Sequence, residues 1–372
     1  MHHAITAERL AAINKGIIDR NKVFYWQTDR PLSPEETGII WADRHSYFTD
    51  DEIIAAVNKA LKDDTIAALE QLDPEAQTSL GNINSVRSAR LASGKEVIIR
   101  CHPRGIRNGY FYAEALAARK ALKAGLPAYR TLVIHEAAND NDFAFHVCEK
   151  LPGTALQHWL QKRPQDEAKL LSDVGKSLAR LHQIKVEGFG PFDNEKAKHY
   201  QLIGLHPTFT KAVRAGLDFN LRALQEHDVI TKSQASAIDQ LFVEGNPLLI
   251  CDTPVLIHND FADWNMLTDG EHITAMLDWD ECVGGDPMMD IACWSTFFDP
   301  SRLDGMLKGY WTMAKKTADF EEKFELLRLR YTISKMTLRV RRYIWEPTDA
   351  IKQRIDIGKT HLADSMAYFG IE

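Results

Sequence analysis

The chain has 372 residues, which is enough for two or three packed domains and a large buried core. Hydrophobic residues make up 45% and charged residues 26% of the sequence, which is ordinary globular usage and excludes a disordered chain. The 45 basic and 52 acidic residues give a formal charge of −7, so nucleic acid is not an expected partner.

The five cysteines are odd in number and widely spaced, without a C-x-x-C motif, which argues against a disulfide framework or a zinc knuckle. The first residues lack the apolar core of a signal peptide, and no run of about 18 apolar residues occurs. We therefore expect a cytoplasmic protein that has no membrane partner. The sequence does not indicate an oligomeric state.

Residues 1–70 are predicted to form a helical N-terminal extension. Capping signals at residues 33–36 and 49–52 each predict the start of a helix, and the second precedes apolar residues at helical spacing. Aromatic residues between these two signals supply apolar bulk. We expect this extension to pack against the rest of the protein.

Residues 71–150 are predicted to form a small lobe, because the hydrophobic period changes from about residue 77. Its elements are β-rich or alanine-rich runs bounded by turn residues. In chain order they are strands at 79–91 and 95–101, a helix at about 110–124, and strands at 132–136 and 143–149. The unit is therefore β-β-α-β-β.

Residues 151–372 are predicted to form a largely helical lobe. One apolar stripe runs along residues 170–181 at helical spacing, as expected of a buried helix face. A short β-rich segment at 255–277 interrupts the helices, and helical periodicity returns from about residue 289.

Polar residues at the ends of these short strands carry the chemistry. The pattern H-x-D-x-x-x-x-N runs from His258 through Asp260 to Asn265, and Asp278 follows the next β-rich run. Isolated Asp and Asn residues usually fill turns, but this spacing between aliphatic runs is hard to obtain by chance. Oxygen ligands from Asn265 and Asp278 suit Mg²⁺ together with phosphate oxygens, and Asp260 can accept a proton from an alcohol. These side chains together predict phosphoryl transfer.

With these residues the sequence resembles the aminoglycoside phosphotransferase family of the protein-kinase-like superfold. The likeness covers about residues 77–300, and the segments 186–192 and 255–281 are most similar to hygromycin-type members. The resemblance implies an α+β bilobal fold. A small antiparallel-sheet lobe with one helix would bind the nucleotide against a large, mainly helical lobe.

The resemblance also implies roles for single residues. Asp260 would be the catalytic base that orients the acceptor hydroxyl, and Asn265 and Asp278 would be the magnesium ligands. His258 would have a structural role in the same loop. Asp290, in a segment that matches the family's G-D-P-x-x-D motif, would brace this loop by hydrogen bonds.

Nucleotide-binding residues are expected in the small lobe. Kinase-like folds place a cation on a strand to hold the phosphates and pair it with a helix glutamate, and here the candidates are Arg100 and Glu114. Most of the family has lysine at the first position, while arginine offers a fork that fits phosphate well. Residues 81–85 would form the nucleotide-covering turn, from which backbone N–H groups and Ser85 would meet phosphate oxygens; the segment has no G-x-G-x-x-G pattern, and an ordinary turn is the alternative. Glu149 and Leu151 flank the lobe junction, where backbone groups would meet the base.

An acidic field surrounds the predicted site, because twelve acidic residues and a single basic one lie between residues 252 and 304. Such a field would attract a polycationic aminoglycoside and Mg²⁺, although part of it could simply occupy solvated turns. Asp263, Asp280 and Glu281 are the expected acceptor contacts. The basic stretch at 323–342 is expected to be the wet face of an amphipathic helix; the alternative is a contact with an anionic acceptor.

The predicted function is a small-molecule kinase that transfers the γ-phosphoryl group of ATP or GTP to a hydroxyl group. The acceptor would be an aminoglycoside-like compound or a metabolite alcohol. Two alternatives stay open: a nucleotide-binding regulatory pseudokinase without catalysis, and a magnesium-dependent hydrolase.

Overall fold

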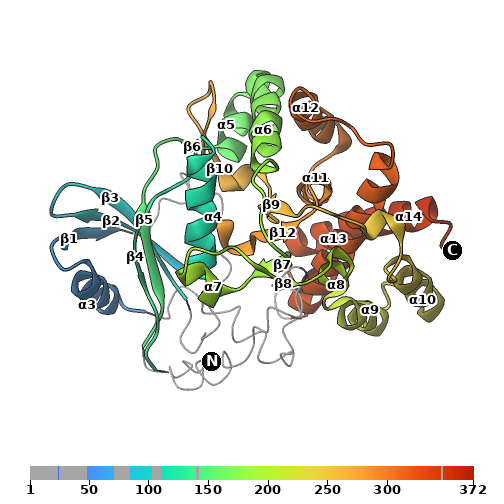
Figure 1. Cartoon of the computed structure of the whole chain (residues 1–372), viewed down its shortest axis with the longest axis horizontal. Helices are drawn as coiled ribbons and strands as arrows, with labels where there is room; N and C mark the ends of the chain where they lie inside the picture. Colours follow the sequence, from blue (N-terminus) through green and yellow to red (C-terminus); the bar gives the residue numbers. More distant parts are fainter. Residues whose placement is uncertain (1–23, 25–47, 71–83, 103–109, 140–141, 345–346) are drawn as a thin grey trace.

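The computed structural model describes residues 24, 48–70, 84–102, 110–139, 142–344 and 347–372, and it has two lobes (Figure 1). A small lobe with a five-stranded sheet forms one end of the molecule, and a mainly helical lobe forms the other, where the chain also ends. The predicted α+β bilobal architecture is therefore confirmed.

The sheet of the small lobe has the strand order β1-β2-β3-β5-β4, and all neighbouring strands are antiparallel. The strands are β1 (Ile66–Glu70), β2 (Ser85–Leu91), β3 (Glu96–Cys101), β4 (Thr131–His135) and β5 (Phe145–Glu149). The last four confirm predicted strands, while residues 79–83 lie outside the described residues. β1 corrects the prediction that residues 1–70 are helical. Its short alanine-containing sequence has no clear β pattern, and pairing with β2 decides its structure.

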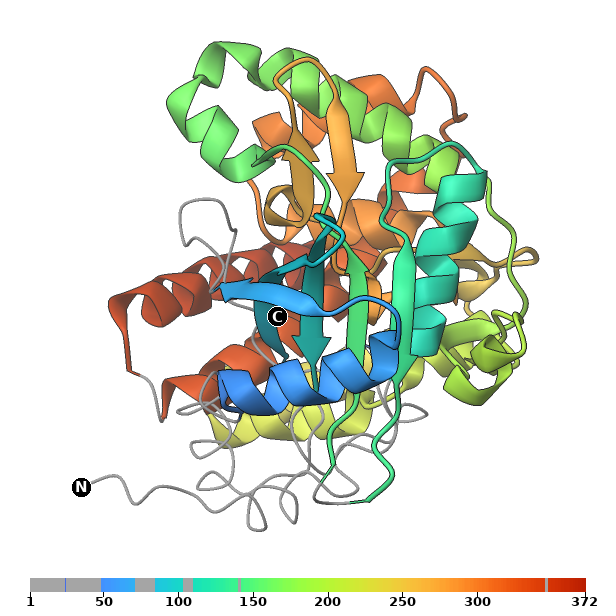
Figure 2. The same ribbon diagram turned by 90° about the vertical axis from the view of Figure 1, so that its left-hand side faces the viewer.

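The outer face of this sheet is covered by α3 (Asp50–Leu61), which crosses in front of the strands in Figure 2. Ile53 and Val57 of this helix are fully buried in one cluster with apolar residues of β2 and β3. The helix begins with the predicted capping box, because Thr49 Oγ1 accepts a hydrogen bond from Glu52 N (3.2 Å) and the Glu52 carboxylate accepts one from Thr49 N (2.9 Å). The other predicted capping box, at residues 33–36, lies outside the described residues.

The predicted helix of the small lobe is α4 (Phe111–Lys123), and it is fastened to the large lobe. Asn194, the first residue of α7 (Asn194–Lys198), caps its N-terminus, because Asn194 Oδ1 accepts hydrogen bonds from Tyr112 N (3.0 Å) and Ala113 N (3.2 Å). Two free N–H groups of the helix are thereby satisfied from the other lobe.

The large lobe is built on helices that pack around one hydrophobic core. Besides α7 they are α5 (Leu156–Lys162), α6 (Glu167–Leu181), α8 (Phe209–Arg214), α9 (Leu217–Glu226), α10 (Lys232–Leu241), α11 (Met288–Ser295), α12 (Pro300–Tyr310), α13 (Phe320–Tyr343) and α14 (Asp349–Tyr368). The predicted apolar stripe of residues 170–181 is buried on α6. None of the helices in the described ranges is both long and apolar enough to span a membrane.

Two small antiparallel sheets carry the loops between these helices. One has the order β11-β10-β6 and the other β8-β7-β12-β9. Their strands are β6 (Thr154–Ala155), β7 (Phe189–Phe192), β8 (Gly204–His206), β9 (Val255–Ile257), β10 (Met266–Thr268), β11 (Ile273–Met276) and β12 (Val283–Gly285). The β-rich interruption predicted at 255–277 is confirmed by β9, β10 and β11.

The basic stretch of α13 differs from the prediction of a wet helix face. Lys323, Arg330 and Lys335 are 8%, 0% and 3% exposed. Lys323 pairs with Asp286 at 2.9 Å, and Arg330 donates to the backbone oxygens of Val213 and Ala215. These cations therefore hold neighbouring elements in place, because partners inside the lobe compensate for the loss of water.

Candidate active site

The loop that follows β9, residues 258–265, is called the catalytic loop below. Asp290, in the first turn of α11, braces it: Asp290 Oδ2 accepts a hydrogen bond from His258 N (2.9 Å) and Oδ1 accepts one from Asn259 N (2.7 Å). These charge-assisted bonds satisfy two buried backbone donors. They confirm the predicted bracing role of Asp290.

Two histidines support this brace. The His258 ring bonds through Nε2 to the carbonyl oxygen of Leu277 (2.8 Å), which confirms its structural role. His182, at the end of α6, lies 3.1 Å from Asp290 Oδ2 through Nε2 and 2.8 Å from the Tyr310 hydroxyl through Nδ1. His182 was not among the predicted residues, since its only signal in the sequence is its position after the apolar stripe of α6.

Asp260 and Asn265 contact each other within the catalytic loop. Asn265 Nδ2 donates to the backbone oxygen of Asp260 (2.9 Å) and to its carboxylate Oδ2 (3.0 Å). The backbone oxygen of Asn265 accepts from Leu277 N (2.8 Å), which places the loop end directly beside Asp278. Asp278 has a left-handed backbone with φ 61°, which bends the chain after β11. The three predicted residues are thus neighbours in space.

Arg100 of β3 joins both lobes. Its guanidinium pairs with Glu114 of α4 through Nη1 and with Asp278 through Nη2 at 2.7 Å, and Asp280 lies 3.3 Å from the same nitrogen. The predicted pair of Arg100 and Glu114 is therefore formed. The planar fork of arginine lets one cation bridge a small-lobe helix and a large-lobe loop.

The carboxylate of Glu114 is fully buried and is held by more than Arg100. The Tyr129 hydroxyl donates to Glu114 Oε1, and His146 Nδ1 lies 3.7 Å from the same oxygen. Burial raises the pKa of Glu114, while Arg100 and Tyr129 oppose this rise. Burial also lowers the pKa of His146 to about 3, so this ring is neutral beside the Arg100 cation.

Tyr129 and His146 were not among the residues predicted from the sequence. His146 stands opposite Arg100 in the register of β3 and β5, so both side chains project from the inner face of the sheet. Only the register between strands that lie far apart in the sequence brings them together.

The carboxamide of Asn265 and the carboxylate of Asp278 form a donor set that fits Mg²⁺. The amide nitrogen of Asn265 faces Asp260, so its oxygen is turned to the other side, and the Asp278 side chain is 38% exposed. Two hard oxygen ligands are what Mg²⁺ takes from a protein when phosphate oxygens and water supply the rest. Within the described residues no group of three or more His, Cys, Asp and Glu side chains is placed to hold a metal.

Ser85, Glu149 and Leu151 are the other predicted nucleotide contacts. Ser85 pairs with Cys101 across β2 and β3, its hydroxyl accepts from Arg87 (3.3 Å), and it is 1% exposed. The hydroxyl therefore lies on the outer face, opposite to Arg100. Glu149 and Leu151 are partly exposed residues at the start of the segment that joins the lobes.

The joining segment ends at Gly153, which has φ +132°. A Cβ atom there would lie 2.7 Å from Thr274 Oγ1, so only glycine fits between the segment and the hairpin of β10 and β11. The position of the joining segment against the large lobe is thereby fixed.

The predicted acceptor contacts are all buried, since Asp263, Asp280 and Glu281 are 2%, 8% and 2% exposed. Asp263 Oδ2 accepts from Arg302 Nη1 (2.9 Å), so the single cation of the acidic stretch is used inside the large lobe. Burial and the neighbouring Asp278 raise the pKa of Asp280 well above its usual range, against the effect of Arg100. Asp280 therefore contacts Arg100, whereas Asp263 contacts Arg302.

Much of the remaining acidic field is also engaged within the protein. Its engaged members accept hydrogen bonds from backbone N–H groups, pair with cations, or do both: they are Asp269, Glu271, Asp286, Asp290 and Asp299. Asp269, Glu271 and Asp299 are exposed, as the alternative of solvated turns predicted, whereas Asp286 and Asp290 are 8% and 0% exposed and act inside the protein.

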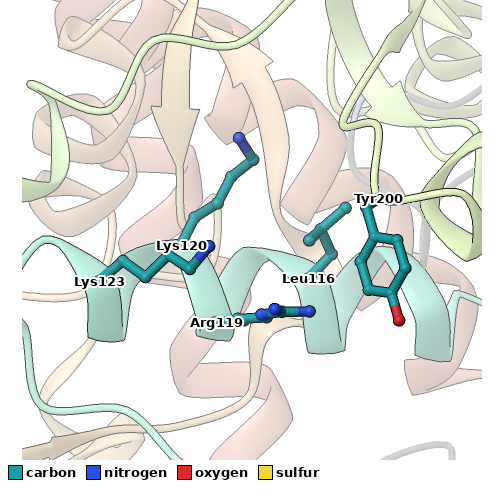
Figure 3. A pocket seen from close by; sticks show the side chains of 5 residues that line it. All are labelled: Leu116, Arg119, Lys120, Lys123 and Tyr200. Carbon is teal, nitrogen blue, oxygen red and sulfur yellow. The ribbon is translucent and has the colours of Figure 1, made fainter.

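A cavity of about 180 Å³ lies on α4, away from these residues (Figure 3). It is lined by Leu116, Arg119, Lys120, Lys123 and Tyr200, and the guanidinium of Arg119 lies 5.1 Å from the centre of the Tyr200 ring. None of the predicted site residues lines it, so it is not the place of the chemistry described above.

A sheet lobe with a strand cation and helix glutamate, joined to a helical lobe with an Asp-Asn-Asp set, defines a kinase-like protein. The sequence profile of the phosphotransferase enzyme family (APH) matches residues 64–322, and the chain belongs to this family. Hygromycin-B 4-O-kinase of Escherichia coli is 27% identical over 187 residues, which are 49% of this chain and 51% of that enzyme. The chain therefore spans about half the length of this curated relative.

Solved structures agree with the fold. A thermostable mutant of aminoglycoside phosphotransferase APH(4)-Ia, in ternary complex with AMP-PNP and hygromycin B, matches with a TM-score of 0.60 and 20% identity. The match covers 83% of this chain and 98% of that one. A choline/ethanolamine kinase family protein from Mesorhizobium loti matches with a TM-score of 0.54 and 18% identity, over 85% of this chain and 94% of that one.

Proposed function

We propose that the protein is a small-molecule kinase that transfers the γ-phosphoryl group of ATP or GTP to a hydroxyl group. The observation that carries this proposal is the convergence of Asp260, Asn265 and Asp278 beside the pair formed by Arg100 and Glu114. Membership of the phosphotransferase enzyme family supports it.

Each residue has a defined task in this reaction. Arg100, held by Glu114, binds phosphate oxygens with its fork. Asp260 accepts a hydrogen bond from the acceptor hydroxyl and aligns its oxygen with the phosphorus, while Asn265 fixes the Asp260 carboxylate from the side. Mg²⁺, which Asn265 and Asp278 would hold, supplies neutralisation of the phosphate charge.

An aminoglycoside-like compound is the first acceptor to test, because hygromycin-B 4-O-kinase is the curated relative. Metabolite alcohols are the second class, because a choline/ethanolamine kinase family protein has the same fold. The cysteines support the expected cytoplasmic location, since all five are free thiols, as in proteins of reducing compartments.

The test is a coupled ADP-release assay over aminoglycosides, hygromycin B first, and common metabolic alcohols, with ATP and with GTP. We expect release of ADP that depends on the acceptor, and a phosphorylated acceptor by mass spectrometry. Asp260→Ala should lower turnover by about 10²-fold or more and leave nucleotide affinity largely unchanged.

The alternatives give different results in the same assay. A hydrolase would release ADP at full rate without any acceptor. A pseudokinase would bind nucleotide and release no ADP with any acceptor, and the complete set of Asp260, Asn265 and Asp278 argues against it. Unchanged turnover in Asp260→Ala would contradict the role of this carboxylate.

A further inference from the structure

Asn259, the residue before Asp260, is held in an unusual conformation. Its φ of 67° is left-handed, a conformation that is uncommon for residues other than glycine and that asparagine adopts more readily than most. The residue is 0% exposed. Since the backbone of Asn259 sets the direction in which the next side chain leaves the loop, whatever holds Asn259 also aims Asp260.

Three hydrogen bonds from two helices, α11 and α13, hold Asn259. Its backbone N–H donates to Asp290 of α11, as described above. Its side-chain oxygen accepts a hydrogen bond from the Tyr331 hydroxyl of α13, and its backbone oxygen accepts one from the Cys293 thiol at 3.3 Å. Burial raises the pKa of Cys293 to about 12, so this thiol keeps the proton that it donates.

Lys335 contacts Cys293, the residue whose thiol donates to the backbone oxygen of Asn259. It lies one helical turn after Tyr331 on α13, so both side chains leave the same face of the helix. Its ammonium donates to Cys293 Sγ (3.4 Å) and to Thr296 Oγ1 (2.7 Å), and it lies 3.1 Å from the centre of the Phe297 ring.

The ammonium of Lys335 interacts electrostatically with the carboxylate of Asp260. Burial lowers the pKa of Lys335 to about 8, while Cys293 and Asp260 oppose this effect. A buried ammonium costs free energy unless its surroundings compensate, and here the compensation comes from the C-terminal end of α11 and an aromatic face. Lys335 thus couples α13 to the same helix that carries Asp290.

We propose that Tyr331 and Lys335 are positioning residues of the catalytic loop, which clamp Asn259 from α13 and thereby aim the Asp260 carboxylate at the acceptor hydroxyl. Tyr331 acts directly on the Asn259 side chain, and Lys335 acts through Cys293 on its backbone oxygen. The effect on turnover rests on the proposed kinase function, whereas the effect on the loop does not.

A purely structural role in the packing of α11 against α13 is the competing explanation, and a matched control separates the two. Thr337 lies on the same helix, and its hydroxyl is buried and bonds to the backbone oxygens of Ile333 (2.9 Å) and Asn220 (3.4 Å), away from the loop. Thr337→Val therefore removes a buried hydroxyl from α13 without touching Asn259.

The experiment compares Tyr331→Phe, Lys335→Met and Thr337→Val in the full chain. Two readouts are used: kcat and nucleotide KM measured separately in the ADP-release assay, and hydrogen exchange of the backbone amides at 258–262. We expect kcat to fall about tenfold in Tyr331→Phe and about thirtyfold in Lys335→Met, with nucleotide KM within about twofold, as loss of one or two aligning contacts predicts. Loop amides should exchange at least about fivefold faster in both variants and unchanged in Thr337→Val.

Because both residues act on Asn259, the double variant should lose less kcat than the product of the two single losses. If Lys335→Met does not fold, Lys335→Gln and Tyr331→Phe carry the test. Wild-type kcat and loop exchange in both variants would overturn the proposal, and so would equal effects in Thr337→Val. If the wild type phosphorylates no acceptor, the proposed function fails, while the exchange experiment still decides whether the clamp exists.

Discussion

The cluster around Arg100 and the catalytic loop around Asp260 are held by different kinds of interaction. Arg100 bridges three carboxylates that come from both lobes, so this cluster depends on charge. The catalytic loop lies within one lobe and is held by hydrogen bonds to Asp290 and to neighbouring helices.

This difference separates adjustable parts of the site from fixed ones. The carboxylate of Asp278 is partly exposed and is bound to Arg100, so phosphate and Mg²⁺ can compete for both partners. Asp290, Cys293 and Tyr331, which hold the backbone and side chain of Asn259, are 0% exposed. We infer that nucleotide rearranges the charged cluster, whereas the loop that aims Asp260 keeps its shape.

The largest effect on the catalytic loop is expected for Asp290→Asn. An amide nitrogen cannot accept the N–H bonds of His258 and Asn259, so a buried donor loses its partner. We expect a loss of about 3 kcal/mol in the free energy of unfolding and a fall in kcat of about 10²-fold or more. Urea unfolding and ADP release measure the two effects. Full stability together with full activity would contradict the bracing role.

Arg100→Lys tests the adjustable part. Lysine keeps the charge but lacks the fork, so it can hold Glu114 or Asp278 but not both in the present geometry. We expect nucleotide KM to rise about tenfold, with kcat reduced less, because one bidentate contact to phosphate is lost. Lys150→Arg, on a half-exposed cation of the joining segment, serves as the control. An unchanged KM would show that Arg100 does not bind phosphate.

His146 gives a pH-dependent test of the same cluster. Its folded pKa of about 3 lies below the ordinary value of 6.5, so its contribution to stability is complete above pH 6.5 and is lost as pH falls toward 3, because the unfolded chain binds the proton. The slope contributed by this group is about 1.4 kcal/mol per pH unit, so about 2 kcal/mol is lost between pH 6.5 and pH 5.

We expect His146→Gln to show a smaller decrease of unfolding free energy over that pH interval than the wild type. The exposed His199→Gln is the control, and it should keep the wild-type slope. Denaturant unfolding at pH 6.5, 6.0, 5.5 and 5.0 measures both. Equal slopes in all three proteins would show that His146 is not kept neutral.

The smallest effect is expected for Ser85→Ala. Since the Ser85 hydroxyl lies on the outer face with Arg87, we expect nucleotide KM to change by less than about twofold, as for a side chain that does not touch the ligand. Initial rates at varied ATP concentration measure this. A tenfold rise in nucleotide KM would show that the Ser85 hydroxyl contacts the nucleotide after all.

Short-range sequence signals predicted much of the fold and the centre of the site. The hairpin of β2 and β3, the stripe of α6 and the capping box of α3 depend on residues close in the chain, and the spacing of Asp260, Asn265 and Asp278 was itself a motif. β1 was not predicted, because its structure comes from pairing with β2 and not from its own composition.

Contacts between residues that lie far apart in the chain could not be predicted from the sequence. The expectation of a solvated face on α13 followed from seven basic residues in one stretch, but Lys323, Arg330 and Lys335 find partners from segments far away in the chain. In the same way Asp263 is held by Arg302, a partner that its local pattern does not reveal. Charge counts predict a field only when the pairing of each charge is known.

The cap that Asn194 places on α4 has a mechanical consequence. The helix that carries Glu114 is anchored at its first turn to α7 of the large lobe, and Arg100 contacts both Glu114 and, in the large lobe, Asp278, so the ion pair of Arg100 and Asp278 spans the two lobes. A swing of the sheet against the large lobe stretches or relaxes the contact between them. The distance between Arg100 and Asp278 therefore reports how far the two lobes have closed on each other.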